Sequence, residues 1–170
     1  ILVGREERIF ERMESLGVSP VGIQIANAAK MENRDQFVEL VYARMQRKGA
    51  LLRDCQRWIN LDRNVFAAAL LAGGEADAMV TGLTRSYAGA VNNVRRVLDA
   101  KPGEIICGMS ILVSDHHTIF VADTTINEDP TAEQLADITV QAAEKVRRFG
   151  VEPRVALMSF SNFGSRGASQ

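Results

Sequence analysis

The sequence predicts an α/β protein, because short apolar runs typical of buried strands alternate with stretches that carry a helical stripe. The clearest case lies within residues 73–98. The apolar run at 78–80 has no helical stripe, as expected of a strand that is buried on both faces. Gly82 follows it, and apolar residues then recur at helical spacing from 91 to 98, with Ser86 placed to cap the helix. The segment is therefore predicted to form a strand, a glycine turn and a helix.

The other elements follow from apolar spacing and from residues that start or stop helices. In chain order, we expect a strand at 1–4, a helix at 6–16 ended by Gly17, a strand at 23–26, a helix that begins at Asn33 or Asp35 and stops at Gly49, and helices at 51–59 and 62–71. β-rich runs at 105–113 and 118–122 predict an antiparallel hairpin. Thr131 and Gln134 fit a capping box for a helix that ends at Gly150, and a buried strand is expected at 155–160.

Composition predicts a soluble globular protein. The chain has 170 residues, of which 46% are hydrophobic and 24% charged, and its formal net charge is −1. A net charge this close to zero indicates neither a nucleic-acid-binding surface nor a polybasic patch for membranes. No apolar run approaches the length of a membrane span. The two cysteines, Cys55 and Cys107, form neither a disulfide framework nor a metal pattern. We therefore expect a cytoplasmic protein that binds neither nucleic acid nor membranes.

Both ends of the sequence suggest an excerpt from a longer protein. The chain opens with a strand-like run at 1–4 and no initiator methionine, and it closes with a polar loop at 164–170. We therefore expect a fragment that is truncated at both ends.

Residues 114–117, which include His116 and His117, are predicted to be the turn of the hairpin rather than a metal site. Adjacent side chains on an extended chain point in opposite directions, and no third ligand is evident. The sequence also offers no credible Ser-His-Asp or Cys-His catalytic set. We therefore predict no metal and no catalytic residues.

Two predicted strands each end in a loop that carries glycine, serine and arginine. Residues 84–86 follow the run at 78–80, and residues 161–166 follow the strand expected at 155–160. Hydroxyls, free N–H groups and arginines suit phosphate or a phosphorylated carrier, and ligands of open α/β sheets bind at the carboxyl ends of strands. Arg85 and Arg166 are therefore hypothesised to share one cleft. The alternative is a structural turn whose arginine lies in solvent.

Residues 127–165 resemble the phosphate acetyltransferase family. They contain an Asn-x-x-Pro turn, a Leu-Ala-x-Ile helix, a Phe-Gly pair and a Pro-Arg-Val-Ala run that leads into Ser-Phe-Ser-x-x-Gly-Ser, and residues 74–82 match another family motif. The resemblance implies a three-layer α/β/α fold with a mixed, mostly parallel sheet, in the isocitrate-dehydrogenase-like two-lobe phosphotransacetylase arrangement. The chain would hold part of the first lobe and most of the inserted second lobe.

The sequence departs from the active members of that family at one position. They usually carry an arginine that helps to bind the acyl phosphate, and Asn92 stands at that position here. Asparagine has no cationic fork, so it stabilises phosphate charge less well. The family's later Ser-Arg catalytic motif would lie beyond Gln170. We therefore expect that this chain does not make acetyl phosphate from acetyl-CoA.

Runs at 53–57, 60–66 and 81–87 resemble the transacetylase-like C-terminal region of large bacterial NADP-dependent malic enzymes. In that family an N-terminal region carries out the oxidative decarboxylation of malate, with NADP and a divalent metal. The C-terminal region is thought to have lost transacetylase activity and to sense acetyl-CoA. The resemblance thus implies a regulatory module that forms a dimer or larger homo-oligomer and binds acetyl-CoA as its effector.

Two alternatives remain at this point: an active phosphate acetyltransferase, and a purely structural dimerisation domain. The residues expected to contact CoA or phosphate come from the two loops and the helix that follows the first one. They are Thr84, Arg85, Ser86, Tyr87, Asn92, Ser159, Ser161, Asn162, Gly164, Ser165 and Arg166.

Overall fold

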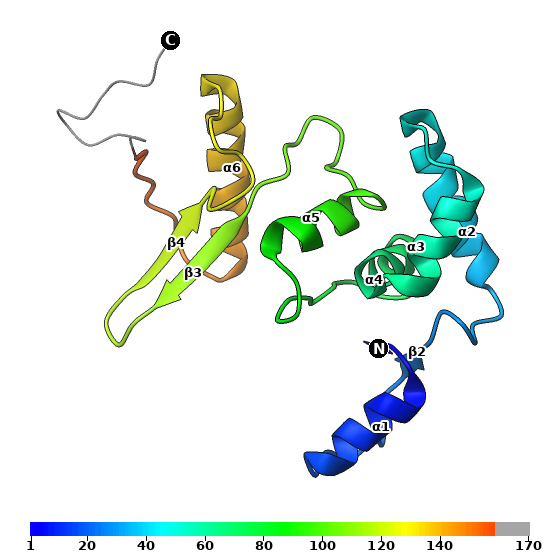
Figure 1. The fold of residues 1–170 in the computed structure, drawn as a ribbon. Helices are drawn as coiled ribbons and strands as arrows, with labels where there is room; N and C mark the ends of the chain where they lie inside the picture. Colours follow the sequence, from blue (N-terminus) through cyan, green and yellow to red (C-terminus); the bar gives the residue numbers. More distant parts are fainter. Residues whose placement is uncertain (159–170) are drawn as a thin grey trace. The chain divides into compact units, whose positions relative to one another are not determined.

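The computed structural model describes residues 1–158, which fall into two units. The first is Ile1–Asp99, and the second begins at Ala100. Among the described residues, the first unit contains several helices and a two-stranded sheet, and the second contains one helix and a two-stranded sheet (Figure 1). No helix in the described part of the chain is both long and apolar enough to cross a membrane.

The first unit begins with a strand, a helix and a second strand parallel to the first. Strand β1 (Leu2–Val3) is followed by α1 (Glu6–Ser15), and β2 (Ile25–Ala26) pairs with β1 in parallel. The predicted elements at 1–4, 6–16 and 23–26 are thus confirmed, with shorter strands. Parallel pairing requires a crossover connection, which α1 provides.

Four further helices complete the described part of the first unit. They are α2 (Arg34–Met45), extended by the 3₁₀ turn η1 (Gln46–Lys48), then α3 (Leu52–Leu61), α4 (Arg63–Ala72) and α5 (Tyr87–Arg95). All four were expected from apolar spacing. Gly49 ends the second helix with a φ of 87°, in the left-handed region that glycine adopts without strain.

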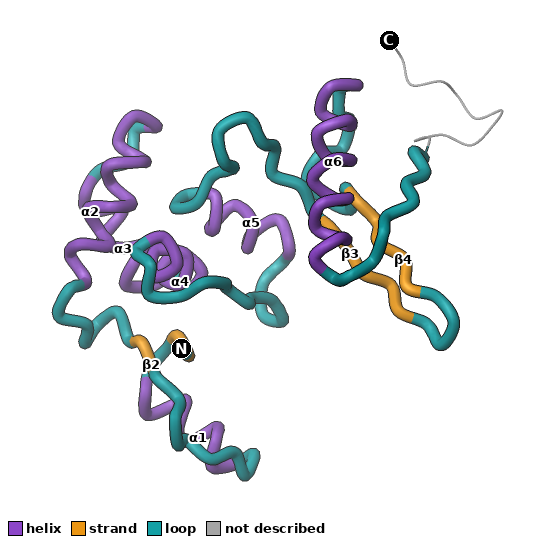
Figure 2. Tube along the Cα trace, turned by 180° about the vertical axis from the view of Figure 1, so that it is seen from behind, coloured by secondary structure: helices purple, strands orange, loops and turns teal. Residues whose placement is uncertain are grey.

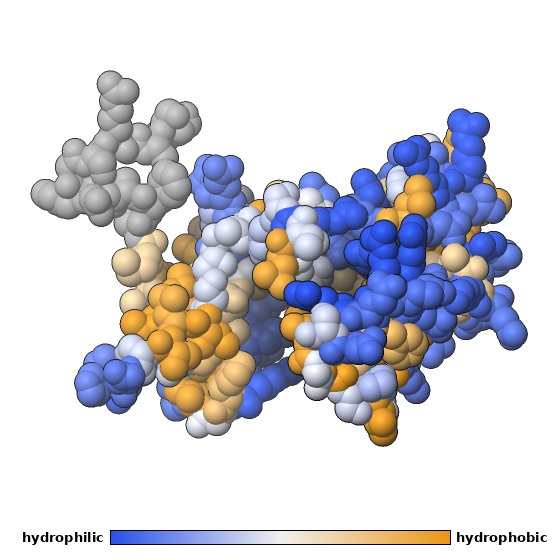
Figure 3. All heavy atoms as spheres, turned by 60° about the horizontal axis from the view of Figure 1, so that its bottom comes forward, coloured by the Kyte–Doolittle hydropathy of each residue, from blue (hydrophilic) through white to orange (hydrophobic). Residues whose placement is uncertain are grey.

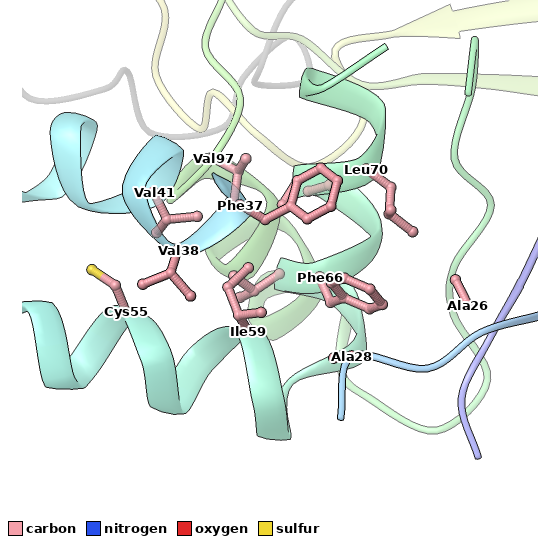
Figure 4. Close-up of a cluster of buried hydrophobic side chains, with 13 residues drawn as sticks. Ala26, Ala28, Phe37, Val38, Val41, Cys55, Ile59, Phe66, Leu70 and Val97 are labelled. Atoms are coloured by element: carbon pink, nitrogen blue, oxygen red, sulfur yellow. The ribbon is translucent and has the colours of Figure 1, made fainter. Parts of the chain in front are cut away.

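The core of the first unit lies where α2, α3 and α4 meet (Figure 4). Phe37 and Phe66 pack edge to face with ring centroids 6.1 Å apart, and Ile59 is fully buried beside them. Gly73, just after α4, is needed for this packing, because a Cβ there would lie 2.7 Å from the Phe37 ring. The three helices therefore form a close-packed platform for the loop that follows α4.

The second unit contains a hairpin and a long helix. Strands β3 (Met109–Val113) and β4 (Thr118–Ala122) pair antiparallel, which confirms the predicted hairpin, although the first strand starts at Met109 rather than at residue 105. Helix α6 (Ala132–Arg148) begins with the predicted Thr131–Gln134 capping box. The Phe149 ring lies 5.4 Å from that of Phe120, so the end of α6 packs against β4.

Two predicted buried strands are wrong in the described structure. Residues 78–80 and 155–158 form no strand and appear as loop in Figure 2. The Val80 side chain is 99% exposed, and Val155 and Leu157 are also exposed. An apolar run forms a strand only where a neighbour satisfies its backbone groups, and the described residues provide no such neighbour for either segment. Residues 159 and 160 of the second predicted strand lie outside the described residues.

Candidate functional site

The loop before α5 is the part of the predicted site that the structure describes. Ser86 caps α5 as predicted, because its Oγ accepts a hydrogen bond from the backbone N–H of Gly89 at 3.3 Å. The backbone N–H of Thr84 donates to the carbonyl oxygen of Gly82 at 2.7 Å. These local bonds set the direction in which the chain enters α5.

Removing the Ser86 hydroxyl tests this cap. We expect Ser86→Ala to destabilise α5 by about 1 kcal/mol, because an N–H group of its first turn loses its partner. Ser86→Thr keeps a hydroxyl acceptor and serves as the control. Hydrogen exchange of the Gly89 and Ala90 amides measures the effect, and equal protection in both variants would contradict the assignment.

Arg85 forms an ion pair within the first unit. Its Nη1 donates to Oδ2 of Asp62 at 2.6 Å. The Asp62 side chain is only 15% exposed, whereas that of Arg85 is 45% exposed. Arg85 therefore has a carboxylate partner within the first unit. A purely structural turn would instead leave this arginine in solvent.

Asp62 is the centre of a polar cluster that includes Arg85 and Asn93, called the Asp62 cluster below. Asp62 is not among the site residues predicted from the sequence. Its Oδ1 caps α4 by accepting from the N–H groups of Asn64 at 2.9 Å and Val65 at 3.3 Å. Its Oδ2 accepts from Asn93 Nδ2 at 2.9 Å as well as from Arg85. One carboxylate thus joins the start of α4 to the loop before α5 and to α5 itself. An aspartate directly before a helix predicts the cap, but no local pattern predicts partners 23 and 31 residues away.

Asn93 and Arg96 extend the cluster towards α3. Arg96 Nη1 donates to Asn93 Oδ1 at 3.0 Å, and its guanidinium carbon lies 4.6 Å from the centroid of the Trp58 ring. This distance suits a cation–π interaction. Asn93 is buried, and both polar atoms of its amide are hydrogen-bonded: Nδ2 donates to Asp62 and Oδ1 accepts from Arg96. The cluster therefore fixes the orientation of α5 on the α3–α4 platform.

A cavity of about 1170 Å³ lies beside the cluster in the first unit. It is lined by β1, by residues 26–30, by the end of α3 and the start of α4, and by residues 76 and 78–85. Arg85 and Thr84 are among the lining residues. Its size is comparable to the space that small-molecule ligands occupy in proteins.

The structure brings together only part of the predicted residue set. Thr84, Arg85, Ser86 and Tyr87 are consecutive around the start of α5, and Asn92 lies exposed on the same helix. Asn92 takes no part in the Asp62 cluster. The six other predicted residues, Ser159, Ser161, Asn162, Gly164, Ser165 and Arg166, lie outside the described residues, so the proposed Arg85–Arg166 cleft stays a prediction.

The cysteines offer no activated nucleophile. Burial raises the pKa of both the Cys55 and the Cys107 thiols, and the neighbouring carboxylates of Asp54 and Asp123 raise them further. Within residues 1–158, no three His, Cys, Asp or Glu side chains are grouped as a metal site requires.

The second unit is organised around another carboxylate, that of Asp123. Its Oδ1 accepts from the N–H groups of Gly108, Thr125 and Ile126, and its Oδ2 accepts from Asn127. Burial alone would raise the pKa of Asp123, but these hydrogen bonds outweigh it and lower the pKa. Asn127 also donates to the carbonyl oxygen of Ile106, so this residue of the Asn-x-x-Pro motif has a structural role.

These features define an α/β protein with a polar cluster at the start of two helices, and comparison with known proteins identifies its family. The model of the phosphate acetyl/butaryl transferase family matches residues 1–170. The chain therefore belongs to that family, which confirms the resemblance seen in the sequence.

Two curated relatives and one solved structure show how the chain compares with longer proteins. It is 48% identical to the NADP-dependent malic enzyme of Rhizobium meliloti over 96% of the chain and 22% of the relative. It is 31% identical to the phosphate acetyltransferase of Bacillus subtilis, over 97% of the chain and 51% of the relative. A phosphotransacetylase from Streptococcus pyogenes superposes with a TM-score of 0.81 at 31% identity, over 99% of the chain and 51% of that protein. The predicted fold class is thus confirmed. The chain spans about a fifth of the malic enzyme and about half of the two transacetylases.

Proposed function

We propose that this chain is the acetyl-CoA-sensing and oligomerisation region of a cytoplasmic NADP-dependent malic enzyme. In this proposal, NADP, the metal and the residues for malate decarboxylation belong to another part of the protein. The 48% identity to such a malic enzyme, over nearly the whole chain, supports it.

The observation that carries the proposal is the ion pair between Arg85 and Asp62. Transfer of an acetyl group to phosphate needs fixed positive charge to stabilise the phosphate oxygens in the transition state. Asp62 offsets the charge of Arg85. Asn92 carries no charge, although the family resemblance places an arginine at its position in active members. An acyl-CoA can still bind through its hydrogen-bonding groups and apolar parts. The site is therefore better suited to binding than to catalysis.

The test is a titration of the full-length protein with acetyl-CoA while malate-dependent NADPH formation is followed. Acetyl-CoA is expected to lower turnover, with a coupling of about 5- to 150-fold in apparent affinity. Arg85→Ala is expected to weaken the inhibition about tenfold, because a hydrogen-bond donor in the cavity lining is lost. Arg12→Ala removes an exposed arginine that does not line the cavity and serves as the control. Inhibition of equal strength in both variants would exclude Arg85 from the sensor.

An active phosphate acetyltransferase is the second candidate, favoured by the likeness to phosphate acetyltransferases in sequence and fold. Release of CoA from acetyl-CoA on addition of phosphate distinguishes the two. Turnover of the order of 10 per second would establish the second candidate and overturn the first.

A further inference from the structure

Helix α3 presents two arginines without an ion-pair partner on its exposed side. Cys55 and Ile59 face the core of the first unit (Figure 4), whereas Arg53 and Arg57 are exposed on the other side of the helix. The two arginines are neighbours one helical turn apart, and neither forms an ion pair with a residue in the described part of the chain. Asp54, between them in the sequence, accepts from a backbone N–H group at the start of α3 at 3.0 Å. This side of α3 therefore carries an excess of positive charge.

Helix α6 of the second unit carries the opposite charge at the same spacing. Glu133 and Asp137 are exposed, lie one helical turn apart and form no ion pair among residues 1–158. Val140 continues this side of α6 and is 58% exposed. On α3, Leu61 follows the two arginines in the same way and is 70% exposed. Each helix thus presents two like charges and then an exposed apolar side chain.

The two faces match when the helices lie side by side and point in the same direction. Three pairs then form: Arg53 with Glu133, Arg57 with Asp137, and Leu61 with Val140. The guanidinium group is suited to such pairs, because its fixed fork donates two parallel hydrogen bonds to one carboxylate. An exposed ion pair contributes little by itself, so the contact depends on several pairs that form together around an apolar one.

A second copy of the chain supplies the complementary face. Each copy carries both the basic side of α3 and the acidic side of α6, so two copies related by a two-fold axis can form the contact twice. Basic residues outnumber acidic ones in residues 1–99, and acidic residues outnumber basic ones in residues 100–170. The charge of the two units therefore favours the same pairing between copies.

We propose that α3 of one copy docks on α6 of a second copy through these three pairs. The inference rests on the oligomerisation part of the proposed function, for which it names the two surfaces that meet. It makes no use of acetyl-CoA.

Charge reversal tests this contact on the full 170-residue chain, with sedimentation velocity as the measurement. Arg53→Glu/Arg57→Glu makes the α3 face acidic, and Glu133→Arg/Asp137→Arg makes the α6 face basic. Each variant by itself should dimerise about tenfold more weakly or worse, because like charges then face one another at both contacts. All four positions are exposed, so the fold should persist, and circular dichroism checks this.

An equimolar mixture of the two variants should restore the dimer. In the mixed pair, each contact again joins an acidic face to a basic one. Raising the salt concentration from about 0.1 M to about 1 M should weaken the parent dimer, because the Debye length falls from about 10 Å to about 3 Å. Arg8→Glu/Arg12→Glu is the matched control, since it reverses two exposed arginines one turn apart on α1 and should leave association unchanged.

The outcomes separate this contact from oligomerisation in general. If the parent dimerises and both reversals leave its affinity unchanged, or if the mixture stays monomeric, the contact between α3 and α6 is wrong and the proposed function stands. If the parent chain does not dimerise with a Kd below about 1 mM, the contact and the oligomerisation of this chain are both overturned, and acetyl-CoA sensing is unaffected.

Discussion

Asp62→Ala is expected to lower the free energy of unfolding of the first unit by about 3 kcal/mol. The substitution removes the cap of α4, for which about 1 kcal/mol is typical, and two hydrogen bonds to a charged group, at about 1.5–3 kcal/mol each before partial compensation by water. It also leaves the buried Asn93 amide without the acceptor of its Nδ2 group. The loss should therefore exceed that of an ordinary helix cap.

Urea unfolding followed by tryptophan fluorescence measures this change. Trp58 is the single tryptophan of the chain and belongs to the first unit, so the signal reports that unit alone. Asp35→Ala is the matched control, because Asp35 is a 78% exposed aspartate near the start of α2. Its exposed ion pair with Arg34 should contribute less than about 1 kcal/mol. Equal effects of the two substitutions would show that Asp62 does not organise the cluster.

Asp123→Ala is expected to have an effect of similar size, about 3 kcal/mol, on the second unit. The carboxylate accepts backbone hydrogen bonds from four residues, and its loss leaves those N–H groups without that acceptor. The loop between β4 and α6 would lose the side chain that accepts these backbone hydrogen bonds. Hydrogen exchange of the Gly108 and Asn127 amides should then become much faster.

The lowered pKa of Asp123 also predicts how stability depends on pH. The folded state holds this pKa below its ordinary value of 3.8. Its contribution to stability is thus fully present above about pH 4 and is lost as the pH falls through the folded pKa. Asp123→Asn should remove this part of the acid sensitivity, whereas Asp115→Asn, in the exposed turn of the hairpin, should keep it. Identical acid profiles for the parent and Asp123→Asn would contradict the assignment.

Several apolar side chains that the sequence pattern predicts to be buried are exposed in the described structure. Figure 3 shows hydrophobic side chains gathered over the hairpin of the second unit, where Leu112, Ile119 and Val121 are exposed on one face. The sequence patterns at 78–80 and 155–158 indicate burial of the same kind, yet those residues are exposed. Apolar composition indicates that a segment favours burial, but it does not supply the neighbour that covers it.

The sequence by itself determined the helices and the hairpin of this protein, because their causes are local. Apolar residues at helical spacing predicted α2 to α6, and Ser86 and the Thr131–Gln134 pair marked two helix starts through bonds that span three residues. Family motifs also identified the phosphotransacetylase fold before any geometry was known.

Only the tertiary structure decided which polar groups meet. Asp62 contacts Asn93 across 31 residues, and Thr81 contacts Asn64 across 17. Asp62 meets Asn93 because α4 and α5 pack against one another, and Thr81 lies in the loop between these two helices. Nothing in the local spacing of the residues encodes that packing. The sequence predicts Arg85 to be a ligand-binding residue, whereas in the structure Arg85 pairs with Asp62, a partner that the sequence does not indicate. A side chain's role in a site depends on the groups around it in space, and folding brings those groups together from distant parts of the chain.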